Sequence, residues 1–228
     1  MSISSSAATI LNTSVPNTQD AGTITSMRIS KTLTSVVSFL VVVMAILYTA
    51  AFLWMYRCSR EHSRPLNKKS GKMLQQYAPY VYMFIVFNAL AELGTSAWLL
   101  TQYRLFQNYP NEHTYTSVKL LLFSNCWTVL VDGAYTLLFL HPSWSGHPVS
   151  SVGAQLIWVT MTWVFYVAGA ALLNHALPLL FLRGICTSVV YCSQLQALFA
   201  LTVIQILVLT GGGVTLVWLA WQSIKGSH

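Results

Sequence analysis

Two long runs without a charged side chain constrain this sequence more than any other feature. No Asp, Glu, Lys or Arg occurs between Asp132 and Arg183, or between Arg183 and Lys225. Each run exceeds the ~20 residues with which a helix crosses the hydrocarbon core of a bilayer. Only 7% of the 228 residues are charged, against roughly a quarter in an ordinary soluble domain. We therefore expect an integral membrane protein with several consecutive spans.

Five apolar stretches are long enough to cross a bilayer. Each is expected to be a helix, because an isolated strand would leave its backbone polar groups unpaired in lipid. A β-barrel is not expected, since its strands would alternate polar and apolar residues over about ten positions. The expected spans are Val36 to Tyr56, Tyr77 to Tyr103, Ser117 to Leu140, Val152 to Leu173 and Leu195 to Trp221. The predicted fold class is an all-α integral membrane protein with about five transmembrane helices.

The segments around these spans predict the domain organisation. The amino-terminal segment is rich in Ser and Thr and has little apolar clustering, so residues 1–33 are expected to be a disordered extracytoplasmic tail. Residues 34–56 read as a retained anchor, with cleavage after Ala50 and Ala51 as the alternative. A basic linker at 57–76, a four-helix membrane domain at 77–222 and a short tail at 223–228 complete the chain.

The distribution of Lys and Arg predicts the orientation in the membrane. Six basic residues follow the first span, against two just before it, Arg28 and Lys31. Short basic loops stay in the cytosol, so the amino terminus should lie outside or in a lumen and the carboxyl terminus in the cytosol. The charge pattern leaves open whether the membrane is the plasma membrane or an endomembrane.

The same basic linker is a candidate contact for lipid headgroups. Clustered Lys and Arg attract anionic lipid by about 1 kcal/mol each near the membrane surface. The alternative, that these charges only fix the topology, stays open. The candidate residues are Arg57, Arg60, Arg64, Lys68, Lys69 and Lys72.

Three candidate modification sites agree with this topology. Asn12 begins an Asn-Thr-Ser triplet, a glycosylation acceptor on the outer side. Cys186 and Cys192 share the outer loop between the fourth and fifth spans, where an oxidising compartment permits a disulfide. Cys58, at the cytosolic end of the first span, is a candidate for palmitoylation.

Polar residues recur at helical spacing in two neighbouring spans. A spacing of three or four residues places side chains on one helical face, and the two stripes are Asn88, Glu92 and Ser96 in the second span and Asn125, Thr128, Asp132 and Thr136 in the third. The two helices should run antiparallel. With 1.5 Å of rise per residue, Glu92 should then lie at about the depth of Asn125, and Asp132 ~10 Å nearer the cytosol. The stripes can face each other, but the two acids are not expected to touch.

Asp132 raises the question of what an acid does near the middle of a membrane span. A central Asp costs roughly 3 kcal/mol on insertion, which the Leu, Phe and Val residues around it offset. The side chain is therefore expected to point toward protein, as a hydrogen-bonding contact between helices. Replacement by Leu should then cost about 0.6 to 2 kcal/mol. The alternatives are a small proton- or solute-coupled transporter or channel, or a membrane-embedded biosynthetic enzyme, using Glu92 and Asp132.

From Tyr77 to its end, the chain resembles the MARVEL domain, a four-helix membrane module, in its fungal form. Three blocks carry the likeness: SVKLLLFSNCWTVLVDGAY at 117–135, WVFYVAGAAL at 163–172 and CSQLQALFAL at 192–201. They look like the second, third and fourth helices of the module. The first span is an addition to the family pattern, and Ser193 stands where the fourth helix usually has a basic residue.

The resemblance implies that the last four spans form an antiparallel bundle and that the role is non-catalytic. Such a protein would organise membrane microdomains or act in vesicle traffic and membrane apposition. Its partners would be the lipid bilayer and other membrane proteins or copies of itself. Neither a cofactor nor a metal nor a nucleic acid is expected.

Overall fold

The computed structural model describes residues 18–61, 69–140, 152–178, 180 and 189–225. These residues form five helices and no strand: α1 (Thr18–Glu61), α2 (Lys69–Phe106), α3 (Glu112–Leu140), α4 (Val152–Ala176) and α5 (Cys192–Lys225). Each helix contains a stretch long and apolar enough to cross a membrane. The expected class, an all-α multi-pass membrane protein, is confirmed.

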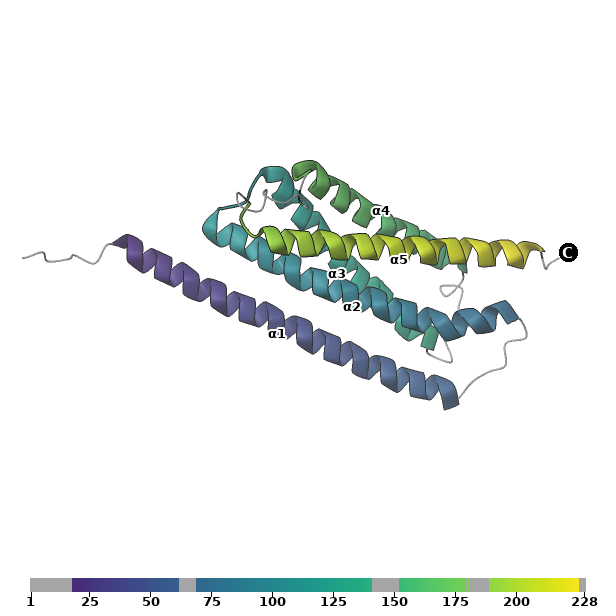
Figure 1. Ribbon diagram of the computed structural model, residues 1–228. Helices are drawn as coiled ribbons and strands as arrows, with labels where there is room; N and C mark the ends of the chain where they lie inside the picture. Colours follow the sequence, from purple (N-terminus) through teal and green to yellow (C-terminus); the bar gives the residue numbers. More distant parts are fainter. Residues whose placement is uncertain (1–17, 62–68, 141–151, 179, 181–188, 226–228) are drawn as a thin grey trace, which may run out of the picture.

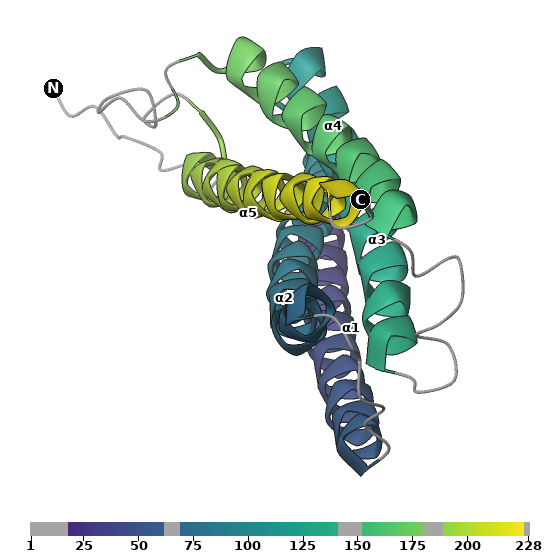
Figure 2. The same cartoon turned by 90° about the vertical axis from the view of Figure 1, so that its right-hand side faces the viewer.

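Consecutive helices alternate in direction, so the start of α1 and the end of α5 lie at opposite ends of the molecule (Figure 1). Contacts between α2 and α3, α3 and α4, α4 and α5, and α2 and α5 close a four-helix bundle. Helix α1 packs on its outside, against α2 and α3. Figure 2 shows α1 beside α2 and away from α4.

Helices α1 and α2 extend further than their apolar stretches. Because α1 begins at Thr18, the expectation of a disordered tail is wrong for residues 18–33; residues 1–17 lie outside the described part. The linker expected at 57–76 is likewise helical at 57–61 and 69–76. An apolar stretch predicts only the part of a helix that lies in the hydrocarbon core of the membrane. Backbone hydrogen bonds can continue the same helix into the polar residues beyond it. Near its start α1 is also tied to α2, where Gln102 Nε2 donates to Ser30 Oγ at 2.7 Å.

The hydrophobic core lies between α2, α3, α4 and α5. Helices α3 and α4 pack closely at Gly169, where an added Cβ would lie 2.6 Å from Leu121 Cδ2. Small residues let membrane helices approach each other in this way. Helix α1 contributes little: 6% of its most apolar stretch is buried, against 39% for α2, α3 and α4. The bundle is therefore the packed unit, and α1 is attached to its surface.

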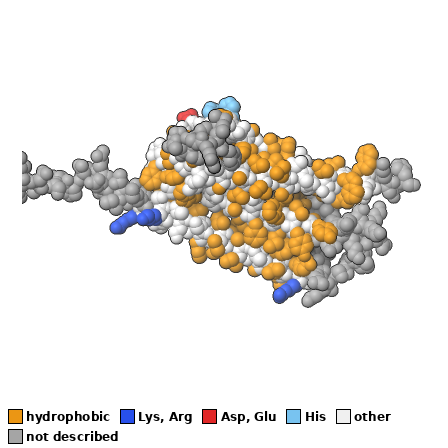
Figure 3. Space-filling model, in the orientation of Figure 1, with side chains coloured by type: hydrophobic (Ala, Val, Ile, Leu, Met, Phe, Trp, Pro, Cys, Tyr) orange, Lys and Arg blue, Asp and Glu red, His pale blue; other side chains and the backbone are white. Residues whose placement is uncertain are grey.

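The outer surface is dominated by apolar side chains. Figure 3 shows them over most of one face, with charged and histidine side chains only near its edges. Trp54, Leu130, Ile157 and Leu207 are among the large apolar residues that are more than half exposed. In a soluble protein so large an apolar surface would mark an interface. On five membrane-crossing helices it is the surface that meets lipid or other membrane proteins.

Candidate functional site

The polar residues predicted on the second and third spans all lie inside the bundle. None is more than 8% exposed, and six of the seven are fully buried. Buried polar groups are normally hydrogen-bonded, because an unpaired group costs free energy in a low-dielectric interior. The set comprises Asn88, Glu92 and Ser96 on α2 and Asn125, Thr128, Asp132 and Thr136 on α3.

Glu92 joins α2 to α5. Its Oε1 accepts a hydrogen bond from Asn88 Nδ2 at 2.9 Å, and its Oε2 accepts one from Thr202 Oγ1 at 3.0 Å. Asn88 Nδ2 also donates to Gln205 Oε1 at 2.7 Å, which adds a second link between the two helices. The carboxyl group thus has both oxygens engaged by neutral side chains.

Asn125 and Tyr166 continue this arrangement across α3 and α4. The Asn125 side chain lies next to the Glu92 carboxyl group, as the antiparallel geometry predicted. Its Oδ1 accepts a hydrogen bond from Tyr166 Oη at 2.6 Å, whereas its Nδ2 has no hydrogen-bond partner within the described residues. Side chains from all four helices of the bundle therefore meet. We call this set the central polar belt: Asn88, Glu92, Asn125, Tyr166, Thr202 and Gln205.

Asp132 does not make the expected hydrogen bond between helices. It is fully buried, yet neither carboxyl oxygen has a hydrogen-bond partner in the described part of the chain. Tyr82, a nearby polar side chain, donates its hydroxyl to Gln155 Oε1 at 3.2 Å instead. The hypothesis of a hydrogen-bonded inter-helix contact is thus wrong for Asp132, and Glu92 makes such a contact.

The backbone at Asp132 nevertheless marks where α1 docks. Thr136 Oγ1 donates to the Asp132 carbonyl oxygen at 2.7 Å and accepts a hydrogen bond from Tyr48 Oη of α1 at 2.9 Å. A Cβ built on the adjacent Gly133 would lie 3.7 Å from the Tyr48 ring. The Tyr48 side chain of α1 therefore packs against Gly133 and is hydrogen-bonded to Thr136 of α3.

Sequence reasoning missed the belt residues of the last two helices, Tyr166 on α4 and Thr202 and Gln205 on α5. Thr202 and Gln205 are three residues apart near the middle of α5, so they share a face and lie at the depth of Glu92. Comparing the depth of polar residues on the fifth span with that of Glu92, as was done for Asn125, would have identified both. Two further inter-helix bonds were missed for the same reason: Trp127 Nε1 donates to Thr162 at 3.3 Å and Trp163 Nε1 to Thr210 at 2.9 Å.

The remaining candidate residues lie near chain ends and loops. Arg57 is exposed at the end of α1, and Cys192 is buried at the first position of α5. On α1 and α2, only the backbone is described at Cys58, Arg60, Lys69 and Lys72. Outside the described residues lie Asn12, Arg64, Lys68 and Cys186. Headgroup binding, glycosylation, palmitoylation and the disulfide therefore stay predictions.

Within the described ranges, no three His, Cys, Asp or Glu side chains gather where they could hold a metal ion. The described interior offers hydrogen bonds between helices. The Asp132 carboxyl group is also buried there, but it has no hydrogen-bond partner within the described residues. No protein-family model matches the chain, and neither a curated protein nor a solved structure matches it.

Proposed function

We propose that this chain is a non-catalytic multi-pass membrane protein that organises membrane microdomains or acts in vesicle traffic and membrane apposition. The observation that carries the proposal is the central polar belt, in which the Glu92 carboxyl group is fully buried and holds α2 against α5. A catalytic acid or base must come within hydrogen-bond reach of its substrate. Glu92 faces neighbouring helices instead, which favours a structural role.

The outer surface supplies the means for such a role. Long apolar faces on α1, α4 and α5 can contact lipid and other membrane proteins or further copies of the chain. The basic residues at and around the connection of α1 to α2, Arg57 near the end of α1 among them, would attract anionic lipid headgroups. We propose further that α2 to α5 correspond to a MARVEL-like module, with α1 as an addition. The packing of α1 on the outside of a closed bundle supports this division.

Asp132 favours a second candidate function, a proton- or solute-coupled transporter or a membrane-embedded enzyme. Ionisable residues in membrane spans often mark ion or proton pathways. The Glu92 carboxyl group is already hydrogen-bonded, whereas the Asp132 carboxyl group has no partner within the described residues and could exchange a proton. Full burial weighs against this candidate, because a relay needs a route to water on both sides of the membrane.

Rescue of a deletion strain separates the two functions. The strain would be followed for the distribution of membrane-domain markers, then complemented with tagged wild-type protein, Glu92→Gln or Asp132→Asn. Both substitutions keep the size of the side chain but remove the exchangeable acid proton. Glu112→Gln, at an exposed position on α3, is the matched control. The structural role predicts correct location and full rescue by all three variants.

A different pattern would contradict the proposal. An Asp132→Asn protein that is stable and correctly located but fails to rescue would establish acid chemistry at this site. A deletion strain with unchanged membrane domains and unchanged vesicle traffic would remove the proposed cellular role, whatever the variants do.

A further inference from the structure

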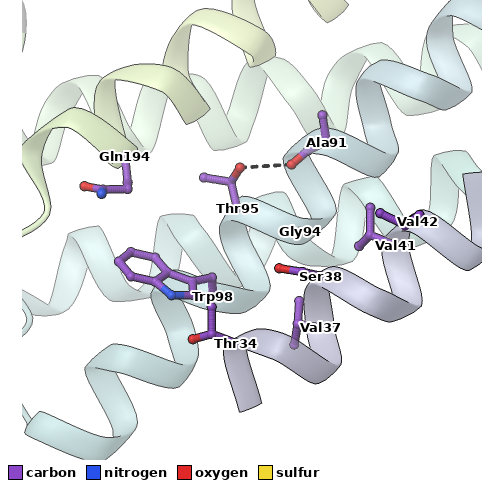
Figure 4. A pocket seen from close by; sticks show the side chains of 10 residues that line it. All are labelled: Thr34, Val37, Ser38, Val41, Val42, Ala91, Gly94, Thr95, Trp98 and Gln194. Carbon is purple, nitrogen blue, oxygen red and sulfur yellow. Dashed lines mark hydrogen bonds between the residues drawn. The ribbon is translucent and has the colours of Figure 1, made fainter. Parts of the chain in front are cut away.

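An open groove runs between α1 and α2 on the outer surface of the molecule. It has a volume of about 440 Å³, and Gln194 of α5 also lines it. The small residues Ala91, Gly94 and Thr95 of α2 face Val37 and Val41 of α1 across it (Figure 4). Small side chains opposite β-branched ones leave this space between two helices that otherwise touch.

The groove reaches from one membrane surface to the middle of the bilayer. Val42 and Ala91, at its deep end, lie at the midpoints of the apolar stretches Arg28–Arg57 and Tyr77–Phe106. At 1.5 Å per residue, Trp98 lies ~10 Å and Thr34 ~12 Å above that level. Half of a hydrocarbon core is ~15 Å thick. The groove therefore matches the depth of a single leaflet.

The two ends of the groove differ in polarity. Valines and alanine line the deep end, whereas Thr34, Trp98 and Gln194 line the end near the surface. Lys31 is exposed, and it lies three residues before Thr34 and seven before Ser38, so the three share a face of α1. At ~17 Å from the midpoint, Lys31 stands just beyond the hydrocarbon core.

The polar end offers hydrogen-bond donors and no negative charge. The hydroxyls of Thr34 and Thr95 donate within their own helices, to the carbonyl oxygens of Ser30 and Ala91. Among the residues drawn in Figure 4, no hydrogen bond is made by the indole N–H of Trp98 or by the hydroxyl of Ser38. In a lipid-facing groove these donors favour a ligand that carries acceptor oxygens.

We propose that the groove is a binding site for one glycerophospholipid molecule. Its acyl chain lies along Val37, Val41 and Ala91, its ester oxygens accept hydrogen bonds near Trp98, and its phosphate lies beside Lys31. The order of cation, donors and hydrocarbon wall follows the order of phosphate, esters and acyl chain in such a lipid. A groove of this size, largely apolar with a few polar groups, falls in the range of small-molecule sites, roughly 300–1,000 Å³. The site is independent of the cellular role proposed above.

Photo-crosslinking in liposomes tests this assignment. The full chain is reconstituted in phosphatidylcholine with a trace of phosphatidylcholine that carries a diazirine on its acyl chain, and the adducts are mapped by mass spectrometry. Adducts should be enriched at 37–42 and 91–95 relative to Leu207, a 65% exposed residue in the middle of α5 that reports bulk lipid. Labelling no stronger than that of Leu207 would overturn the proposal.

Groove filling tests whether the enrichment belongs to this space. Ala91→Phe should lower labelling of 37–42 to the level of Leu207, while Ala171→Phe, at an exposed alanine of α4, should leave it unchanged. Elution of each variant as a single species in size-exclusion chromatography checks that it is folded. Equal labelling in both folded variants would contradict the assignment.

The phosphate contact has its own test, which does not depend on groove filling. Trace diacylglycerol and phosphatidylcholine with the same photoreactive chain are compared. Wild type should prefer phosphatidylcholine, and Lys31→Gln should reduce that preference by up to about fivefold, the upper range for one exposed ion pair. Lys119→Gln, at an exposed position on α3 that does not line the groove, is the control. Equal labelling by both probes in wild type, or displacement of the phosphatidylcholine probe by added sterol, would overturn the choice of a phospholipid.

Discussion

Replacing the two buried carboxyl groups by leucine should affect the free energy of unfolding differently: Glu92→Leu should lower it, whereas Asp132→Leu should not. Glu92→Leu removes the acceptor of a hydrogen bond from Thr202 across the interface of α2 and α5. Such bonds contribute about 0.6 to 2 kcal/mol in membrane proteins. Without Glu92 the single hydroxyl proton of Thr202 can go to the Leu198 carbonyl oxygen, at 2.8 Å, and Asn88 still donates to Gln205. We therefore expect a loss within that range rather than above it.

Asp132→Leu should instead leave stability unchanged or increase it. The substitution breaks no side-chain hydrogen bond within the described residues, because neither carboxyl oxygen has a partner there. A buried polar group without a partner costs about 1 to 3 kcal/mol, so its removal can return up to that amount. The sequence alone predicted the opposite sign, since it assigned the inter-helix contact to Asp132.

Steric trapping in bicelles measures the free energy of unfolding directly. Glu92→Gln and Asp132→Asn serve as controls that keep side-chain size, and Glu92→Gln should cost less than Glu92→Leu because it keeps an acceptor oxygen for Thr202. Two results would refute the reasoning. If Asp132→Leu destabilises as much as Glu92→Leu, the aspartate has a stabilising partner in the native protein. If Glu92→Leu has no effect, the central polar belt does not stabilise the bundle.

Three further predictions concern topology, the outer loop and helix packing. Reporter fusions at the amino terminus should report an outside location, and fusions after the last residue should report a cytosolic one. If both ends report the same side, either the first span is cleaved off or the number of spans is wrong. In unreduced, denatured protein, thiol labelling should spare Cys186 and Cys192, and full labelling of both would rule out the disulfide. Gly169→Ala should cost about 1 to 3 kcal/mol of unfolding free energy by overpacking, because its Cβ meets Leu121. Gly211→Ala, with nothing within 4 Å, should not destabilise, and equal effects of the two would contradict the close packing of α3 and α4.

The sequence predicted the five helices because a mostly apolar run of ~20 residues or more permits almost no other structure in lipid. It predicted the ends of α1 and α2 poorly. Residues 18–33 are polar, and their helix depends on continuing α1 and on the contact of Ser30 with Gln102. Neither of these is visible in composition.

The site was predicted in part, for a related reason. Helical spacing placed the seven polar residues of α2 and α3 on common faces, and all are buried. Spacing gives no information on which group bonds to which, since that depends on the rotation of neighbouring helices. Glu92 therefore gained partners on α5 that the sequence had not identified, and Asp132 lacked the expected one.

The central polar belt also determines how the protein can respond to bilayer thickness. Bonds that join α2 to α5 and α3 to α4 near mid-depth oppose sliding of these helices along their axes. A membrane thicker or thinner than the bundle must then be matched by tilting the whole bundle or by deforming the surrounding lipid, at a cost of a fraction of a kcal/mol per Å. Helix α1 lies outside the belt and is lightly packed, so it can tilt separately. Its angle to the bundle, and with it the width of the groove beside α2, should change with the thickness of the host membrane.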